Sequence, residues 1–244
     1  MLFHSGQGAG GFSIFAPSFE YLGRITPIST TSTPTYSSFS GTFSGLTTEN
    51  ISLIIAVIQS RDANGSTGIP YSNVTIDGQS ATIINRSYTG GTTDFNSTAI
   101  AYIKKNIGNS INISVTLNAT HEGQANIFLY KMTSNFATFY NSNSNVISSG
   151  SVIQTNLTTP PTPPFVSKLS AVIAVSTTSN STSAWTIGAS QGTMTQNASL
   201  DAGTTEFITV SSSINIPKST SITFTASGSN STNDASILVA SFYA

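Results

Sequence analysis

Apolar and polar side chains alternate residue by residue in several stretches of this 244-residue chain. Between residues 111 and 118, every odd position is Ile, Val or Leu and every even position is Asn, Ser or Thr. Residues 221–226 repeat the pattern. Because successive side chains of a β-strand point to opposite faces, the pattern predicts strands with one buried and one wet face. Residues 53–58, 169–175 and 237–242 are mostly apolar and predict strands covered on both faces.

Composition supports strands and argues against helices. Ser, Thr and Asn account for 98 of the 244 residues, whereas charged residues make up only 7%. Ser, Thr and Asn disfavour helix interiors and suit turns and solvent-facing strand positions. Hydrophobic residues still reach 38%, which is enough for a core. We therefore expect an all-β fold, an antiparallel β-sandwich of jelly-roll type with about a dozen strands.

The N-terminal residues stand apart from this pattern. Residues 1–33 begin with a Gly-rich stretch and continue with four apolar residues that show no alternation: Phe12, Ile14, Phe15 and Phe19. We expect an extended N-terminal arm over residues 1–33, whose four apolar side chains bind a partner, and a β-sandwich domain over residues 34–244. Residues 141–150, which are mostly Asn and Ser, and the Pro-rich residues 159–164 predict loops.

A weak internal repeat divides the domain. Strand-like segments at 53–58, 111–117 and 125–132 recur in the same order at 169–175, 220–226 and 236–243. The repeat fits the two Greek keys of one jelly roll, or two small tandem sandwiches with halves 34–158 and 165–244. Neither half alone has many long apolar strands, so we favour one sandwich.

One tight turn is visible in the sequence. Asp77 and Gly78 separate the strand-like runs 74–76 and 81–83. An Asp-Gly pair between two strands is a strong hairpin signal, because both residues of the turn need a positive φ. We assign Asp77 and Gly78 a structural role.

Several classes of partner are disfavoured. The chain has eight basic and nine acidic residues, so it lacks the excess of Lys and Arg that phosphate contacts in nucleic acid require. Its one adjacent basic pair, Lys104-Lys105, fits a charged strand end better than a binding patch. The longest apolar run, residues 53–58, is far too short to span a membrane. The chain has no cysteine and begins with no secretory leader, so we expect a soluble protein without disulfides.

We expect no catalytic, cofactor-binding or metal site. Gly6, Gly8 and Gly11 have dinucleotide-binding spacing, but no strand precedes them and no helix follows. The two histidines, His4 and His121, are too few for a zinc site, and the nine acids are scattered. Calcium in an Asp- or Asn-containing loop stays an alternative. Trp185, the single tryptophan, fits a core position better than a sugar platform.

Two stretches, the hairpin at residues 74–82 and the closing segment at residues 235–242, are similar to motifs of a family of uncharacterised virion proteins from marine bacteriophages. Residues 74–82, Val-Thr-Ile-Asp-Gly-Gln-Ser-Ala-Thr, resemble that family's hairpin "V-x-I-G-G-x-x-A-T", with Asp77 in place of its first Gly. Residues 235–242 are similar to its closing motif "A-x-x-x-A-S-F", and the Gly-rich start at residues 3–8 is also similar. The resemblance covers roughly residues 35–244 and implies a structural role in a phage particle, without catalytic residues.

We therefore expect a non-enzymatic phage virion protein on the particle exterior. The first hypothesis is a capsid decoration or cement protein that is held by its N-terminal arm. Its expected partners are the major capsid protein or other virion proteins, together with further copies of itself in a homo-oligomer. The alternative is a tail or head fibre component, or a carbohydrate-binding adhesin that contacts a host glycan. For the adhesin, the candidate aromatic residues are Tyr88, Tyr102, Tyr140, Trp185 and Tyr243.

Overall fold

The described part of the chain consists of antiparallel β-strands joined by short connections. The computed structural model describes residues 18–28, 35–62, 71–89, 95–134, 136–147, 150–158, 169–178, 185–201, 206–214, 221–232 and 234–243. Within these ranges every regular element is a strand, which confirms the predicted all-β antiparallel sandwich class. No helix in these ranges is long and apolar enough to cross a membrane.

The strands fall into two consecutive sets. The first set is β1 (Ser18–Ile28), β2 (Thr35–Ser44), β3 (Glu49–Asp62), β4 (Tyr71–Ile76), β5 (Gln79–Ser80), β6 (Thr82–Thr89), β7 (Phe95–Ile107), β8 (Ser110–Glu122) and β9 (Ala125–Thr133). The second set is β10 (Thr138–Ile147), β11 (Gly150–Thr158), β12 (Leu169–Thr178), β13 (Thr186–Ala189), β14 (Thr193–Asp201), β15 (Glu206–Ile214), β16 (Ser221–Thr232) and β17 (Asp234–Tyr243). We call these sets the first and the second half.

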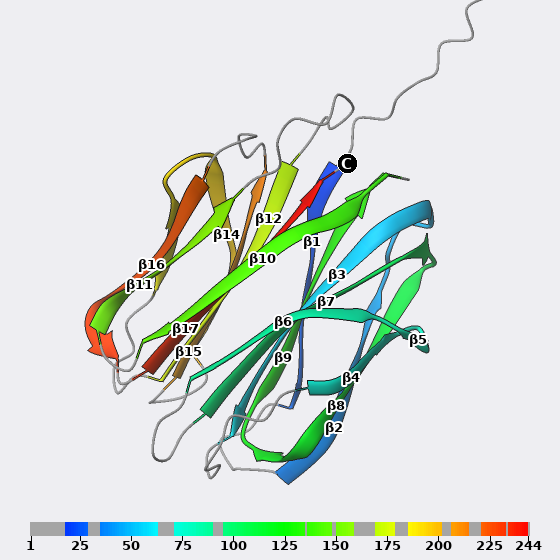
Figure 1. The fold of residues 1–244 in the computed structure, drawn as a ribbon. Coiled ribbons are helices and arrows are strands. Elements are labelled where there is room, and N and C mark those ends of the chain that lie inside the picture. Colours follow the sequence, from blue (N-terminus) through cyan, green and yellow to red (C-terminus); the bar gives the residue numbers. More distant parts are fainter. Residues whose placement is uncertain are drawn as a thin grey trace, which may run out of the picture.

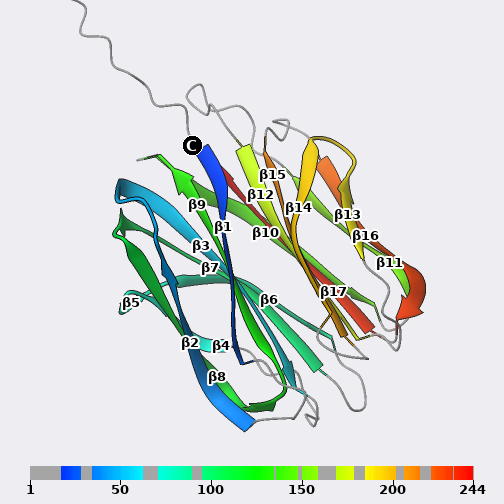
Figure 2. The same ribbon diagram turned by 180° about the vertical axis from the view of Figure 1, so that it is seen from behind.

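Each half forms two sheets. In the first half, the inner sheet has the order β1-β9-β3-β7-β6 and the outer sheet the order β2-β8-β4-β5. In the second half, the inner sheet has the order β10-β17-β12-β15-β14 and the outer sheet the order β11-β16-β13. The two inner sheets pack against each other, so the molecule is a stack of four layers with one outer sheet at each end (Figures 1 and 2).

Three separate apolar layers fill the spaces between the four sheets. The first half's core lies between its two sheets and includes Ile54, Ile113 and Leu129. The second half's core is built in the same way around Ile173, Trp185 and Phe224. A third layer, with Leu53, Tyr130, Leu238 and Phe242 among its members, lies between the halves. Strands β3, β9, β12 and β17 contribute to two layers each, which explains why the central positions of these strands are apolar on both faces.

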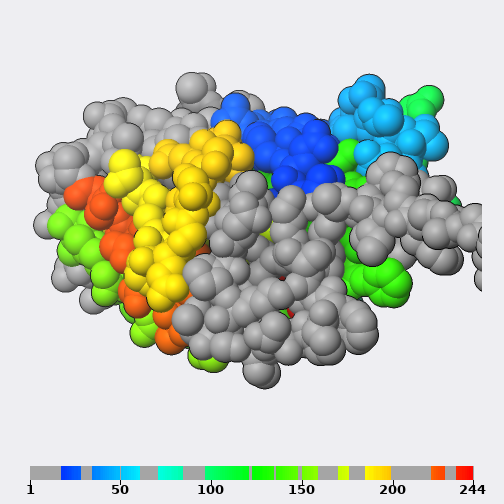
Figure 3. All heavy atoms as spheres, turned by 90° about the horizontal axis from the view of Figure 1, so that it is seen from above, coloured from blue at the N-terminus to red at the C-terminus, as the bar shows by residue number. Residues whose placement is uncertain are grey.

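The two halves repeat the same strand order. In chain order, β1 to β4 match β10 to β13, and β6 to β9 match β14 to β17. With this matching, each strand of the first half's inner sheet has the same neighbours as its counterpart in the second half's inner sheet. The repeat read from the sequence lies on matching strands: β3, β8 and β9 in the first half, and β12, β16 and β17 in the second. Figure 3, seen from above, shows β1 of the first half beside β14 of the second.

The prediction of one sandwich over residues 34–244 is therefore corrected. The described strands form two sandwiches, and the second begins with β10 rather than at residue 165. The Pro-rich residues 159–164, which were expected to be a crossing loop or linker, lie outside the described residues. The prediction of one sandwich rested on the small number of long apolar strands in each half. In the structure, strands that are apolar on both faces pack their second apolar face between the halves.

The predicted arm is also corrected in part. Residues 18–28 of the expected 1–33 arm form β1, which pairs with β9 from Ser18↔Thr133 to Ile28↔Ala125. Irregularities between Tyr21 and Gly23 and between Ile25 and Ile28 shift the register of this pairing. These shifts break the period-two pattern, so the sequence shows no alternation there. The rest of the expected arm, residues 1–17 and 29–33, lies outside the described residues.

The expected loop at residues 141–150 is mostly strand. Its Asn residues lie on β10, an edge strand of the second half's inner sheet, and face β11, an edge strand of the outer sheet. The side-chain amides of Asn141, Asn143 and Asn145 donate hydrogen bonds to the backbone carbonyls of Thr158, Asn156 and Gln154, at 3.1, 2.6 and 2.8 Å. We call this array the asparagine ladder. It joins the edges of two sheets through side chains.

Candidate functional site

The Asp77-Gly78 pair forms the tight turn that the sequence predicts. Asp77 has φ 48° and Gly78 φ 75°, and the turn joins β4 to β5. The Asp77 amide donates to the Asn112 carbonyl at 2.7 Å, and the Asn112 amide donates to Asp77 Oδ1 at 2.6 Å. Lys105 Nζ lies 2.5 Å from Asp77 Oδ2. These contacts hold the turn against β8 and β7, so Asp77 has a structural role.

The four apolar residues assigned to partner binding separate into two groups. Phe12, Ile14 and Phe15 lie outside the described residues, so their role stays a prediction. Phe19 is part of β1 and stacks on Tyr130 with ring centroids 5.8 Å apart, in the layer between the halves. Phe19 is therefore a packing residue of the body and not part of a detached arm.

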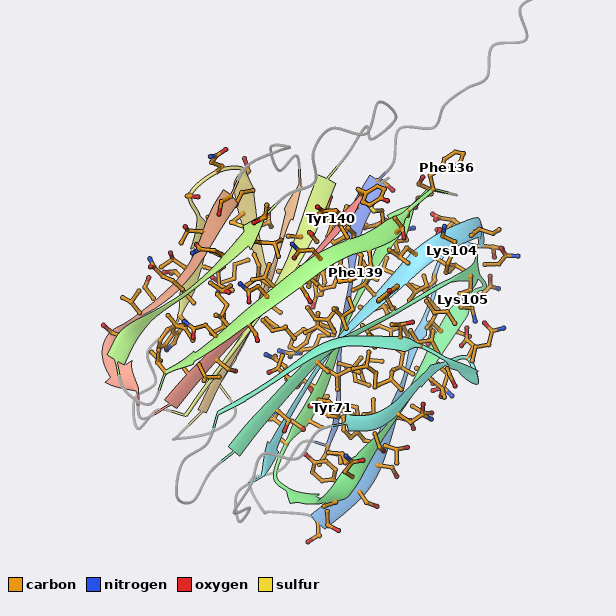
Figure 4. All side chains as sticks on the ribbon, viewed as in Figure 1. Tyr71, Lys104, Lys105, Phe136, Phe139 and Tyr140 are labelled. Atoms are coloured by element: carbon orange, nitrogen blue, oxygen red, sulfur yellow. The ribbon has the colours of Figure 1, made fainter. Side chains whose placement is uncertain are left out.

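The aromatic residues considered for sugar binding do not gather on one face. Trp185 is 1% exposed, and it lies so close to Gly228 that a Cβ there would be 2.7 Å from the indole ring. Tyr102 stacks on Phe139 between the halves. Tyr140 and Tyr243 contact each other at the end of the second half's core, and the Tyr88 side chain lies outside the described part. Figure 4 shows Phe139 and Tyr140, neighbours in the sequence, on the long strand β10.

One aromatic residue is strongly exposed. Phe136 is 82% exposed and lies at the junction between the halves, at the upper corner in Figure 4. The junction is held by the Phe136 amide, which donates to Ser134 Oγ, and by the Ala137 amide, which donates to the Ser134 carbonyl, both at 3.1 Å. β1 begins close to this corner, because Ser18 pairs with Thr133.

The two outer sheets expose hydroxyl and amide groups. On the first half's outer sheet, the exposed strand positions include Ser38, Ser40, Thr42, Asn112, Thr116, Asn118, Ser72 and Asn73. On the second half's outer sheet they include Gln154, Asn156, Thr158, Thr186 and Ser221. Side chains here bond to each other, as Thr223 Oγ1 donates to Asn156 Oδ1 at 2.7 Å. Both ends of the four-layer stack therefore present polar groups without formal charge at these positions.

A cluster of charged side chains lies at one end of the first half's core. Lys131, on β9, has a side chain only 8% exposed, and its Nζ lies 2.6 Å from Glu49 Oε1 and 3.2 Å from Glu20 Oε2. Glu20 is on β1 and Glu49 begins β3, so the strands on either side of β9 supply the carboxylates. Thr133 Oγ1 donates to Glu49 Oε2 at 3.1 Å.

The charged forms of Lys131 and Glu49 stabilise each other. Burial disfavours the charge of Glu49, but hydrogen bonds from Lys131, Thr133 and Ser52 outweigh it and lower the pKa of the Glu49 carboxyl. Burial also disfavours the charge of Lys131, but its bonds to Glu49 and Glu20 outweigh burial and raise the pKa of the Lys131 ammonium. Both groups are therefore ionised near neutral pH.

A pocket of about 260 Å³ opens beside Lys131. Polar groups of Glu20, Ser44, Thr47 and Lys131 line it together with the apolar side chains of Leu22, Leu46 and Ile107. Glu49 does not line the pocket, and its carboxylate contacts Lys131 Nζ. No local sequence motif marks this site, because Lys131 and Glu49 are 82 positions apart.

The described residues hold no group of three or more His, Asp or Glu side chains arranged to bind a metal ion. The buried hydroxyl of Tyr71 donates to the Ser97 carbonyl at 2.8 Å and lies 2.8 Å from Ser60 Oγ, and burial raises the pKa of Tyr71 well above its usual value. Tyr71 thus fits a core role.

No protein-family model and no curated protein matches this chain.

Proposed function

We propose that this protein is a non-enzymatic structural component of a bacteriophage particle, a decoration or cement protein on the capsid exterior. The observation that carries the proposal is the four-layer body whose two outer sheets expose hydroxyl and amide groups. Such groups exchange hydrogen bonds with water for hydrogen bonds with a neighbour and desolvate no full charge. A net charge of −1 also leaves little repulsion between copies packed side by side.

Attachment is assigned to residues 1–17. Phe12, Ile14 and Phe15 lie in this segment, and each contributes roughly 1.5–3 kcal/mol when its side chain becomes fully buried. β1 begins at Ser18, which pairs with Thr133 near the exposed Phe136, and Phe136 is proposed to contact the same neighbour. The partner is the major capsid protein or another virion protein, and further copies of this chain complete the lattice.

The strand order supports a jelly roll in each half. In the first half, the first strand lies beside the last, and the second strand beside the penultimate one. The second half repeats this, with β10 beside β17 and β11 beside β16. This wrapped order is that of two interlocked Greek keys.

The proposal is tested by deleting the gene for this protein from the phage genome. We expect assembled heads that lack this protein and release their genome at a lower temperature than wild-type heads. Purified full-length protein added back should sediment with these heads and restore their stability, whereas a variant lacking residues 1–17 should stay in the supernatant. Heads of unchanged stability, or full-length protein that does not sediment with them, would contradict the decoration role.

The alternative, a fibre component or adhesin, makes a different prediction. It requires the isolated protein to bind a host glycan, and tail-less or non-adsorbing particles should appear when the gene is removed. The partly exposed pair Tyr140 and Tyr243 is the aromatic contact that remains for this role. Adsorption assays with the deletion phage separate the two proposals.

A further inference from the structure

The duplication allows one end of the first half's core to be compared with its counterpart in the second half. Phe19 pairs with Met132 in the first half, and Phe139 pairs with Phe242 in the second. Counting from these pairs, Lys131 corresponds to Ser241 and Thr133 to Tyr243. The β10–β17 pairing shifts register between Phe139 and Asn141, so Glu20, which pairs with Lys131, corresponds to Asn141, which pairs with Ser241, and Tyr140 is an extra residue at this shift.

The second half fills this position. The rings of Tyr140 and Tyr243 meet edge to face with centroids 6.3 Å apart. Ser241 is fully buried, and its hydroxyl donates to the Asn141 carbonyl at 3.2 Å. The same fold therefore closes this end of its core with two aromatic rings and one small hydroxyl group.

The first half leaves the position open. Thr133 stands at the position of Tyr243 and Lys131 at that of Ser241, and β1 has no extra residue at the position of Tyr140. The pocket of about 260 Å³ is lined by Glu20 and Lys131 among others. Burying an ammonium group also costs free energy that the serine avoids.

We propose that this pocket is a binding site for a neutral, hydroxyl-rich ligand of the size of one sugar ring. Lys131 and Glu20 form the recognising pair. Their contact is the looser one of the cluster, at 3.2 Å, and Glu20 is 54% exposed, so a ligand hydroxyl can enter between them. Such a hydroxyl accepts a hydrogen bond from the ammonium group and donates one to the carboxylate, which are both strong charge-assisted bonds.

The rest of the lining fits the same class of ligand. Leu22, Leu46 and Ile107 offer an apolar surface to the C–H face of a ring, while the hydroxyls of Ser44 and Thr47 offer further hydrogen bonds. The volume lies below the roughly 300–1,000 Å³ of sites that take drug-sized ligands, which limits the ligand to a single ring. Two carboxylates and one ammonium disfavour an anion. This site is independent of the role in a phage particle.

Saturation-transfer NMR of the full chain with the methyl glycosides of glucose, galactose, mannose and N-acetylglucosamine tests the proposal. We expect transfer to at least one glycoside. The Glu20→Gln variant should bind it about tenfold more weakly, because one charge-assisted hydrogen bond is weakened at an exposed position. Lys104→Met, an exposed lysine that does not line the pocket, is the matched control and should bind like the wild type.

A second variant places the second half's serine and tyrosine at the positions that match Ser241 and Tyr243, together with a tyrosine at position 20 of the pocket lining. Glu20→Tyr, Lys131→Ser and Thr133→Tyr together should abolish transfer, with circular dichroism confirming a retained β fold. Absence of transfer to all four glycosides in the wild type, or binding by Glu20→Gln equal to wild type, would overturn the proposal. A saturable response to methylammonium or calcium chloride without any response to glycosides would overturn the ligand class.

Discussion

At the scale of single residues, the backbone conformation of the turn at Asp77 and Gly78 restricts which residue fits at position 78, whereas packing does not. Gly78 has φ 75°, and a Cβ built on it would meet no atom within 4 Å. The left-handed backbone is therefore the only constraint on this position. Asp77 satisfies the same constraint with hydrogen bonds to Asn112, and Asn and Asp are the residues other than Gly that tolerate this region best.

The loss of stability on replacing Gly78 should therefore depend on the shape of the new side chain near its backbone. We expect Gly78→Val to lower the free energy of unfolding by about 1–3 kcal/mol, because a β-branched side chain is strained at positive φ. Gly78→Asn is the control and should cost clearly less. Urea denaturation of both variants measures the difference. Equal losses would show that the turn does not constrain this backbone as described.

The pair of Lys131 and Glu49 should make stability depend on pH. The pKa of Glu49 is below its ordinary value of 4.5, so its contribution is fully present above about pH 4.5. It is lost as the pH falls through the lowered pKa of the folded state, because protonation then removes the ion pair. Lys131 has a raised pKa, so its contribution is present below pH 10.5 and is lost as the pH rises through the folded-state value.

Melting temperatures between pH 7 and strongly acidic conditions check this expectation. The wild type should lose more stability below about pH 4.5 than the Glu49→Gln variant, whose side chain does not titrate. Glu20→Gln serves as the comparison, because Glu20 is more exposed and lies farther from Lys131. Parallel curves for wild type and Glu49→Gln would show that the ion pair contributes no pH dependence.

At the scale of elements, the two halves close the same edge in different ways. The edge between β10 and β11 is joined by the asparagine ladder. At the matching edge between β1 and β2, Ile25 packs against Gly41, where an added Cβ would lie 3.0 Å from Ile25. One edge is closed by amide hydrogen bonds and the other by apolar contact, and both limit the pairing of these edges with foreign strands.

The ladder should contribute measurably to stability. We expect Asn143→Ser to lower the free energy of unfolding by about 0.5–1.5 kcal/mol, because the shorter side chain no longer reaches the Asn156 carbonyl. Asn118→Ser, at an exposed position of β8, is the matched control and should change little. Urea denaturation compares them. A loss at position 143 no larger than at position 118 would contradict the role of the ladder.

Sequence patterns predicted the regular strands well and failed where strands are irregular or unusually polar. Residues 111–118 alternate without interruption, and β8 covers them. Register shifts hide the alternation of β1, and Asn side chains that bond to β11 give β10 the composition of a loop. The pocket beside Lys131 combines residues from distant parts of the chain. No local pattern contains that information, because strand pairing alone brings Glu20 and Lys131 together.

At the scale of the whole molecule, the layer between the halves makes the body one unit. Phe19 and Tyr21 on β1 contact Tyr130, and the Tyr130 hydroxyl donates to Asn197 Oδ1 of the other half at 3.1 Å. Gln59 donates to the Val175 carbonyl across the same layer at 3.1 Å. β1 therefore supports both its own sheet and the contact between halves.

Two truncations should behave differently for this reason. Removing residues 1–17 should leave the melting temperature nearly unchanged, because β1 stays intact. Removing residues 1–33 should lower it strongly, because the inner sheet loses β1 and the layer between the halves loses Phe19 and Tyr21. Circular dichroism during heating measures both. A shorter truncation that unfolds, or a longer one that melts like the full chain, would contradict this account of β1.

The strand-for-strand repeat also gives the chain redundancy. In a single sandwich, every substitution at the end of the core acts on the only copy of the fold. Here the second half has Tyr140 and Tyr243 at this end of its core, whereas the first half has Glu20, Lys131 and Thr133. Selection can therefore preserve the fold of one half while side chains of the other half change and form a binding site. A mutational scan of the two halves would then show unequal tolerance at equivalent positions.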